Sequence, residues 1–229
     1  NIDGLPVTCC NLSGPMGLAY IPYVAIMQRA SGPVINLYNS AKATAKTAAG
    51  KDVTFTIKGR FPINNTVSIE IDEVKKETFA MNLHIPAWSE NTEVYVNNKQ
   101  VKDVKSGEYL TLTRKWKKGD RIRITFDMRA KLIDAPKGSN PKAWDCQALV
   151  YGPLVLSRDE NIDPDYNKPV QIIADENRNV HVQRVVPEKE KTRIEFLVPT
   201  TTGTIRMVDY SSVDGWHGKQ ICTWLPRLK

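Results

Sequence analysis

Two short stretches decide the fold, VTFTI at residues 53–57 and VSIEI at residues 67–71. Each alternates apolar with polar side chains, which is the pattern of a β-strand that buries one face. Similar stretches recur along the next part of the chain and are separated by turn residues such as Asn97-Asn98. They predict an antiparallel β-sandwich over residues 31–134, with strands at 34–38, 53–57, 67–71, 79–85, 92–96, 109–112 and 122–126.

A second series of predicted strands follows a polar break at residues 134–141. Its strands are expected at 148–151, 154–156, 170–173, 180–182, 194–197 and 204–208. The break is the best domain boundary, and residues 135–229 are predicted to form a second antiparallel β-sandwich. The fold class is therefore all-β, with two consecutive sandwiches.

Residues 1–30 hold the one predicted helix. Ser13 or Gly14 can cap it, Pro15 suits its first turn, and apolar residues occupy every face as far as Ala30. A helix of this kind must be buried all round, so we expect it to pack against other helices that this chain does not contain. Its apolar run is interrupted by Pro22 and is shorter than the roughly 20 residues that cross a membrane, so no membrane partner is expected.

Composition and charge exclude several classes of protein. With 229 residues, 41% hydrophobic and 25% charged, the chain is a folded protein and is neither collagenous nor mostly disordered. The net charge of +7 comes largely from residues 102–137, which hold eleven Lys or Arg against five Asp or Glu. Arg121 and Arg123 alternate there with Ile122 and Ile124, which predicts a strand with one solvated face. No aromatic residues interleave with these arginines, so nucleic acid is not an expected partner.

The four cysteines fall into two groups. Cys9 and Cys10 are adjacent and precede the predicted helix, where the helix dipole favours the thiolate that acts as a nucleophile or binds a metal. Cys146 and Cys222 stand singly in apolar stretches and are either small buried residues or one disulfide. The spacing of the four does not resemble a structural zinc module.

Other chemical side chains have a structural interpretation beside the functional one. His84 and His181 alternate with apolar neighbours and are expected on the outer faces of strands, and His217 lies in a glycine-rich loop. Trp88 and Trp116 are either core residues or platforms on which a sugar ring stacks. The acidic residues 159, 160, 163 and 165 lack the spacing of a calcium loop and are expected to be solvated.

The order of these segments resembles the C-terminal part of glycoside hydrolase family 127, the β-L-arabinofuranosidase-like enzymes. The matching pieces are Cys9-Cys10-Asn11, Gly14-Pro15, residues 17–22, 34–38, 83–88, 94–98, 107–110, 114–120 and 149–154. The resemblance implies an (α/α)6 barrel with the active site, followed by two β-sandwiches. This chain would then hold the last barrel helix (1–30), the middle sandwich (31–134) and the C-terminal sandwich (135–229).

The resemblance also implies a chemistry for the sulfur pair. By position, Cys9 would be the nucleophile of a retaining glycosidase and a zinc ligand, and Cys10 would be a further zinc ligand. The other ligands and the acid would lie upstream of Asn1, so we expect this chain alone to be inactive and to hold no cofactor. The expected partners are an arabinose-containing glycan and the missing barrel, and the expected location is periplasmic or secreted. The alternatives are that Cys9 and Cys10 are buried structural thiols, and that the chain is a carbohydrate-binding or structural module.

Overall fold

The computed structural model describes residues 9–138, 145–185, 194–213 and 219–228, and it divides the chain into two compact units. The first unit runs from Asn1 to Phe126 and the second from Asp127 to Lys229. In the described part of the chain, no helix has both the length and the apolar character needed to span a membrane. The two units are described separately below.

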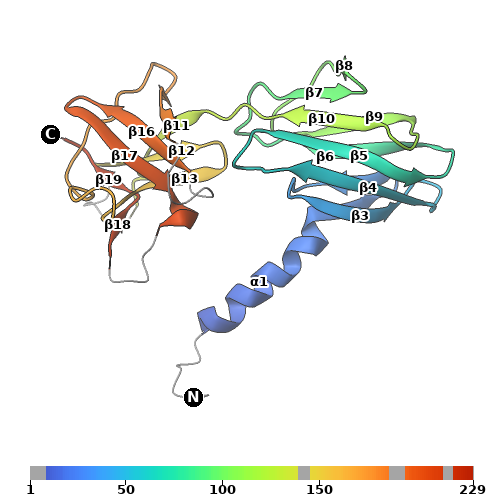
Figure 1. Cartoon of the computed structure of the whole chain (residues 1–229), viewed down its shortest axis with the longest axis horizontal. Helices are drawn as coiled ribbons and strands as arrows, with labels where there is room; N and C mark the ends of the chain where they lie inside the picture. The colour runs from blue at the N-terminus through green and yellow to red at the C-terminus, as the bar shows by residue number, and fades with distance from the viewer. Residues whose placement is uncertain (1–8, 139–144, 186–193, 214–218, 229) are drawn as a thin grey trace. The chain divides into compact units, whose positions relative to one another are not determined.

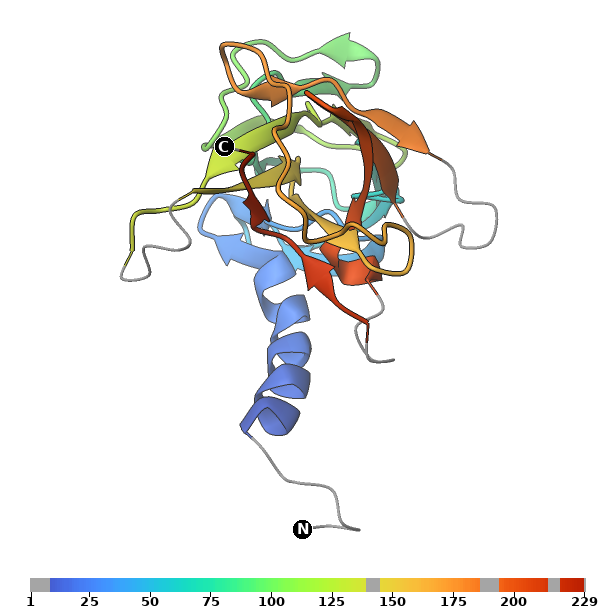
Figure 2. The same ribbon diagram turned by 90° about the vertical axis from the view of Figure 1, so that its left-hand side faces the viewer.

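One α-helix, α1 (Cys9–Ala25), leads into the first unit. It begins earlier than the sequence predicts and includes Pro15 and Pro22, and it ends at Ala25 instead of Ala30. The early end has a structural reason: Asn36 donates its backbone N–H to the carbonyl of Ala25 (2.9 Å) and its side-chain amide to the carbonyl of Val24 (2.8 Å). These bonds satisfy carbonyl groups that the last turn of a helix leaves free. Figures 1 and 2 both show α1 standing away from the strands of its own unit.

The residues after α1 start a four-stranded sheet. β1 (Ile26–Arg29) forms a hairpin with β2 (Gly32–Ile35), and β2 lies parallel to β6 (Thr78–His84). β9 (Tyr109–Lys115) completes the order β1-β2-β6-β9 as an edge strand. The predicted antiparallel arrangement therefore has one exception here, because β2 and β6 run in the same direction.

The second sheet of this unit has six antiparallel strands in the order β3-β4-β5-β10-β7-β8 (Figure 1). Its strands are β3 (Ala41–Lys46), β4 (Asp52–Gly59), β5 (Thr66–Val74), β7 (Glu93–Val96), β8 (Lys99–Gln100) and β10 (Arg121–Thr125). Alternate residues of β4, β5 and β10 are fully buried, as the sequence predicts, and they form the core with apolar residues of β6. On the outer face of β10, Arg121 and Arg123 are exposed, which confirms the predicted solvated face.

The second unit begins eight residues before the boundary that the sequence predicts. Residues 130–134 form β11 (Ala130–Asp134), which pairs with β12 (Cys146–Tyr151) and so belongs to the second unit. The other strands are β13 (Leu154–Asp159), β14 (Asn179–Val180), β15 (Gln183–Val185), β16 (Glu195–Thr200), β17 (Gly203–Asp209), β18 (Ile221–Cys222) and β19 (Leu225–Pro226), and a short 3-10 helix, η2 (Tyr210–Ser212), follows β17.

The strands of the second unit are linked by hydrogen bonds into one nine-stranded sheet, with β18 and β19 branching from β13 and β12. Leu149, Leu156, Phe196 and Val198 are buried in its core. The predicted strand at 170–173 is reduced to one isolated bridge between Ile172 and Thr200. The all-β class with a single α-helix is confirmed for the described residues.

Candidate functional site

The predicted catalytic pair lies at the start of α1. The described helix begins at Cys9, so Cys9 and Cys10 occupy its first described turn and do not precede it. Their side chains are outside the described residues. The nucleophile and zinc-ligand roles of Cys9 and Cys10 therefore stay predictions.

The apolar residues of α1 are exposed to solvent. Leu18 is 68% exposed and Tyr23 is 76% exposed, and the same holds to a lesser degree for Met16, Tyr20, Ile21 and Val24. A helix with large apolar residues on all its faces is normally covered by protein. The expectation that the described chain does not itself enclose this helix is confirmed.

The two tryptophans of the first unit are packing residues. Trp116 is fully buried and donates its indole N–H to the carbonyl of Phe79 (3.2 Å). Trp88 is half-buried, and its ring is stacked on the ring of Phe61 with centroids 6.3 Å apart. Neither ring is presented as an open platform for a sugar.

The histidines do not form a cluster in the described part of the chain. His84 is half-buried beside the ring of Tyr109, with centroids 5.3 Å apart, and its backbone carbonyl accepts a hydrogen bond from Tyr38. His181 is exposed, and His217 lies outside the described residues. His84 lies in β6 as the sequence predicts, whereas His181 lies between β14 and β15 and not within the strand expected at 180–182.

The acidic residues near the end of β13 are used by their own loop. Asp163 accepts a hydrogen bond from the buried Arg158 (2.7 Å), and Asp159 accepts the backbone N–H of Asn161 (2.9 Å). Asp159 is buried, contrary to the expected solvated loop, while Asp165 is exposed and forms an ion pair with Lys168. Among the described residues, no group of three or more His, Cys, Asp or Glu is arranged to hold a metal.

Cys146 and Cys222 are free thiols and do not form a disulfide. Both are half-buried, and burial is the main reason why the pKa of the Cys222 thiol is raised. A raised pKa keeps a thiol protonated and poorly reactive. Of the two alternatives that the sequence leaves open for this pair, the structure supports small, partly buried thiols.

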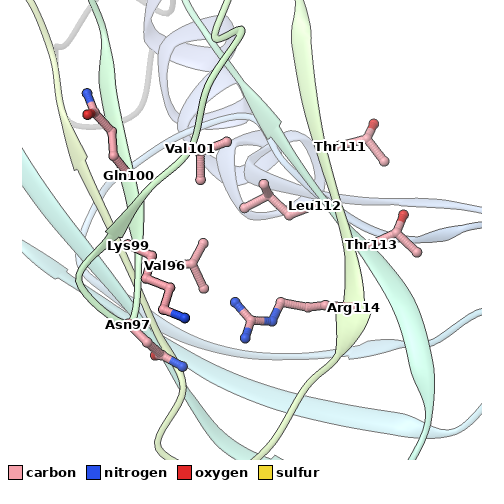
Figure 3. A pocket seen from close by; sticks show the side chains of 9 residues that line it. All are labelled: Val96, Asn97, Lys99, Gln100, Val101, Thr111, Leu112, Thr113 and Arg114. Carbon is pink, nitrogen blue, oxygen red and sulfur yellow. The ribbon is translucent and has the colours of Figure 1, made fainter.

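A groove of about 600 Å³ lies in the first unit, between the β7–β8 hairpin and β9. Figure 3 shows the side chains that line it. β8 and β9 are edge strands of the two sheets, so the groove lies where the sandwich is open. It is lined by Val96, Asn97, Lys99, Gln100, Val101, Thr111, Leu112, Thr113 and Arg114. The sequence predicts a solvated strand face for the basic residues 102–137 and does not predict this groove, half of whose lining lies before them. The alternation along β9 could have indicated it, because Arg114 falls on the same row as Leu110 and Leu112.

Comparison with known proteins supports the resemblance to family 127. Residues 33–128 match the family model described as the middle domain of GH127 β-L-arabinofuranosidase. This match covers all strands from β3 to β10 and most of β2. No curated protein sequence matches the chain.

Solved structures resemble the chain over 96% of its length. One is named a glycoside hydrolase (TM-score 0.81, 19% identity), and this chain covers 40% of it. A GH127 β-L-arabinofuranosidase from Geobacillus stearothermophilus T6 gives a TM-score of 0.76 at 18% identity, with 37% of it covered. A second GH127 β-arabinofuranosidase gives 0.76 at 21% identity, with 38% covered. The chain thus spans about two fifths of the length of these proteins and shares the fold of that part.

Proposed function

We propose that this chain is the C-terminal part of a glycoside hydrolase that cleaves arabinose-containing glycans. The observation that carries the proposal is the match of residues 33–128 to the GH127 middle domain. The exposed apolar residues of α1 support it, because a helical barrel packed on α1 would bury them. The two β-rich units would then brace the barrel, and the whole protein would act in the periplasm or outside the cell.

In this proposal Cys9 is the nucleophile of a retaining mechanism. Its thiolate attacks the anomeric carbon, and a carboxylic acid from another part of the protein protonates the departing oxygen. Water then attacks the same carbon, the acid's carboxylate takes the proton of that water, and the bond between sugar and sulfur breaks. A place for Cys9 near the N-terminal end of the helix, as the sequence predicts, would favour the thiolate, since that end of a helix carries partial positive charge.

Zinc fits the donor chemistry of the pair in part. Thiolates are strong zinc ligands, so Cys9 and Cys10 would hold the ion together with ligands from outside the described residues. Zinc sites use about four ligands, and neighbouring positions of a helix point in different directions, so the pair can supply only part of the set. When bound, Zn²⁺ keeps its cysteine ligands deprotonated at neutral pH.

A second candidate is an accessory module without a catalytic role of its own. The observation that favours it is the groove between β8 and β9, which lies within the first unit and contains no residue of the proposed catalytic pair. In that case the chain would bind or position a glycan, and Cys9 and Cys10 would be structural thiols.

The two candidates are separated by one experiment on the full-length natural protein. Cleavage of p-nitrophenyl β-L-arabinofuranoside and bound zinc are measured for wild type, Cys9→Ser, Cys10→Ser and the control Cys222→Ser. We expect Cys9→Ser to abolish cleavage, Cys10→Ser to lower zinc content, and Cys222→Ser to change neither. Full activity of Cys9→Ser would remove the nucleophile assignment and favour the accessory module.

A further inference from the structure

The groove between β8 and β9 carries positive charge without an acidic residue in its lining. Two basic side chains enter it from opposite sides, Lys99 from β8 and Arg114 from β9, and Figure 3 shows both extending toward its centre. Within the described residues, no ion pair joins Lys99 or Arg114 to a carboxylate. Two facing cations that lack a counter-charge favour the binding of an anion.

The position of Arg114 on its strand is unusual for a charged residue. Along β9, Thr111 and Thr113 are exposed, whereas Leu112 and Arg114 are half-buried on the opposite face. The guanidinium of Arg114 lies over the ring of the buried Trp116, 5.1 Å from its centroid. This contact restricts the movement of the guanidinium, whose planar fork of N–H groups suits a planar acceptor such as a carboxylate.

One acidic group, Asp120, lies beside the groove but does not line it. Asp120 bonds to the lining residue Asn97 (2.8 Å), but it is buried and its other oxygen accepts the backbone N–H of Lys117 (3.0 Å). These bonds fix the carboxylate in its own turn, and Arg114 and Lys99 remain the charged side chains that line the groove. Lys115, Lys117 and Lys118 add to the positive field of the same segment.

The remaining lining suits a sugar. Val101 and Leu112 give the groove apolar surface against which the C–H face of a pyranose can lie, whereas the amide of Gln100 points away from them in Figure 3. The volume of about 600 Å³ lies within the range of small-ligand sites, about 300–1,000 Å³.

We propose that this groove binds the carboxylate of an acidic sugar, a uronic acid unit of a glycan, with Arg114 and Lys99 as its charged partners. The choice of a glycan rests on the proposed function, whereas the choice of an anion rests on the groove itself. The site would hold an acidic part of a polysaccharide on the first unit, apart from the proposed catalytic pair at Cys9 and Cys10.

The test is a binding titration of the whole 229-residue chain, followed by NMR of its backbone amides, with trigalacturonate as the probe. We expect shifts of amides in residues 96–101 and 111–114. Arg114→Gln and Lys99→Gln should each weaken binding about tenfold, because each removes one charge-assisted hydrogen bond. The matched control is Lys115→Gln, which removes the same charge from the next, exposed position of β9 and should change affinity less than twofold.

Several results would overturn the proposal. Equal losses for Lys115→Gln and Arg114→Gln would mean diffuse attraction to a basic surface. Equal binding of neutral galactotriose would mean that the carboxylate is irrelevant, and equal binding of a pentaglutamate peptide with the same shifts would assign the groove to an extended acidic peptide. Lys99 lies in an exposed hairpin, so Lys99→Gln remains informative if Arg114→Gln disturbs the fold.

The two proposals fail separately. If trigalacturonate does not bind but the full-length protein cleaves arabinofuranosides through Cys9, the groove assignment fails alone. If trigalacturonate binds as expected but the full-length protein cleaves no arabinofuranoside, the proposed catalytic function fails alone.

Discussion

Replacing Gly32 by alanine should destabilise the first unit strongly. Gly32 starts β2 with a φ of +139°, a backbone conformation that residues other than glycine rarely adopt. A Cβ at this position would lie 2.2 Å from the backbone oxygen of Ala80 on β6, a contact that no rotamer change can relieve. The backbone N–H of Ala80 also donates to the carbonyl of Ser31 (3.0 Å), so moving the strands apart would weaken the β2–β6 junction.

The expected cost can be built from these parts. The backbone conformation alone costs about 1–3 kcal/mol for a residue with a Cβ. Disturbing the strand junction adds about 1 kcal/mol for each hydrogen bond that is lost. The total for Gly32→Ala is therefore about 3 kcal/mol or more, a large part of the roughly 5–15 kcal/mol that holds a domain folded.

Gly203→Ala is the matched control. Gly203 has a nearly identical φ of +134°, but a Cβ there would meet no atom within 4 Å. Thermal unfolding followed by circular dichroism should show a loss of more than about 10 °C for the first unit in Gly32→Ala, and a smaller loss for the second unit in Gly203→Ala. A loss for Gly32→Ala that is no larger than that for Gly203→Ala would refute the argument from close approach.

Three further predictions concern buried and charged groups. Trp116→Phe leaves the carbonyl of Phe79 without its partner and should lower the unfolding free energy by about 2–3 kcal/mol in a urea titration. Burial raises the pKa of Tyr38, so the stability linked to its protonated hydroxyl is present below pH 10 and is lost as the pH rises above that value. The fall in unfolding free energy between pH 10 and pH 12 should therefore be smaller in Tyr38→Phe. A hydrogen bond from Arg178 is the main cause of the lowered pKa of Asp134, so the stability that this carboxylate contributes is present above about pH 4 and is lost as the pH falls through the lowered pKa. Asp134→Asn should reduce the stability lost over that acid range in urea titrations at successive pH values.

The sequence predicts the parts of the fold in which burial sets the pattern. Val53, Phe55 and Ile57 alternate with polar residues because one face of β4 is buried, and the structure confirms this strand. β3 was not predicted, because its sequence AKATAK carries few residues that favour strands. Its pairing with β4 depends on backbone hydrogen bonds and on contacts such as the one between the Thr44 and Thr54 hydroxyls (2.9 Å). Such support comes from the neighbouring strand and is not encoded locally.

The candidate sites also differ in how far the local sequence pattern predicts them. The exposed α1 could be predicted, because a short segment cannot cover large apolar residues on every face of its own helix. The groove could not be predicted in full, because Lys99 and Arg114 meet only when β8 and β9 become edges of two facing sheets. Strand order is a tertiary property, and the alternation along β9 indicates only which way Arg114 points.

The anchoring of α1 connects the fold to the proposed function. Asn36 bonds to the last carbonyls of the helix, and its side-chain oxygen accepts a hydrogen bond from Tyr109 of β9 (2.7 Å). The guanidinium of Arg29 on β1 lies 4.6 Å from the centroid of the same tyrosine ring. The end of the helix is thus fixed to both β1 and β9, although its length is exposed. In the proposed function, a helix fixed to the sheet at one end would hold a barrel packed on its apolar surface in a defined position relative to the first unit.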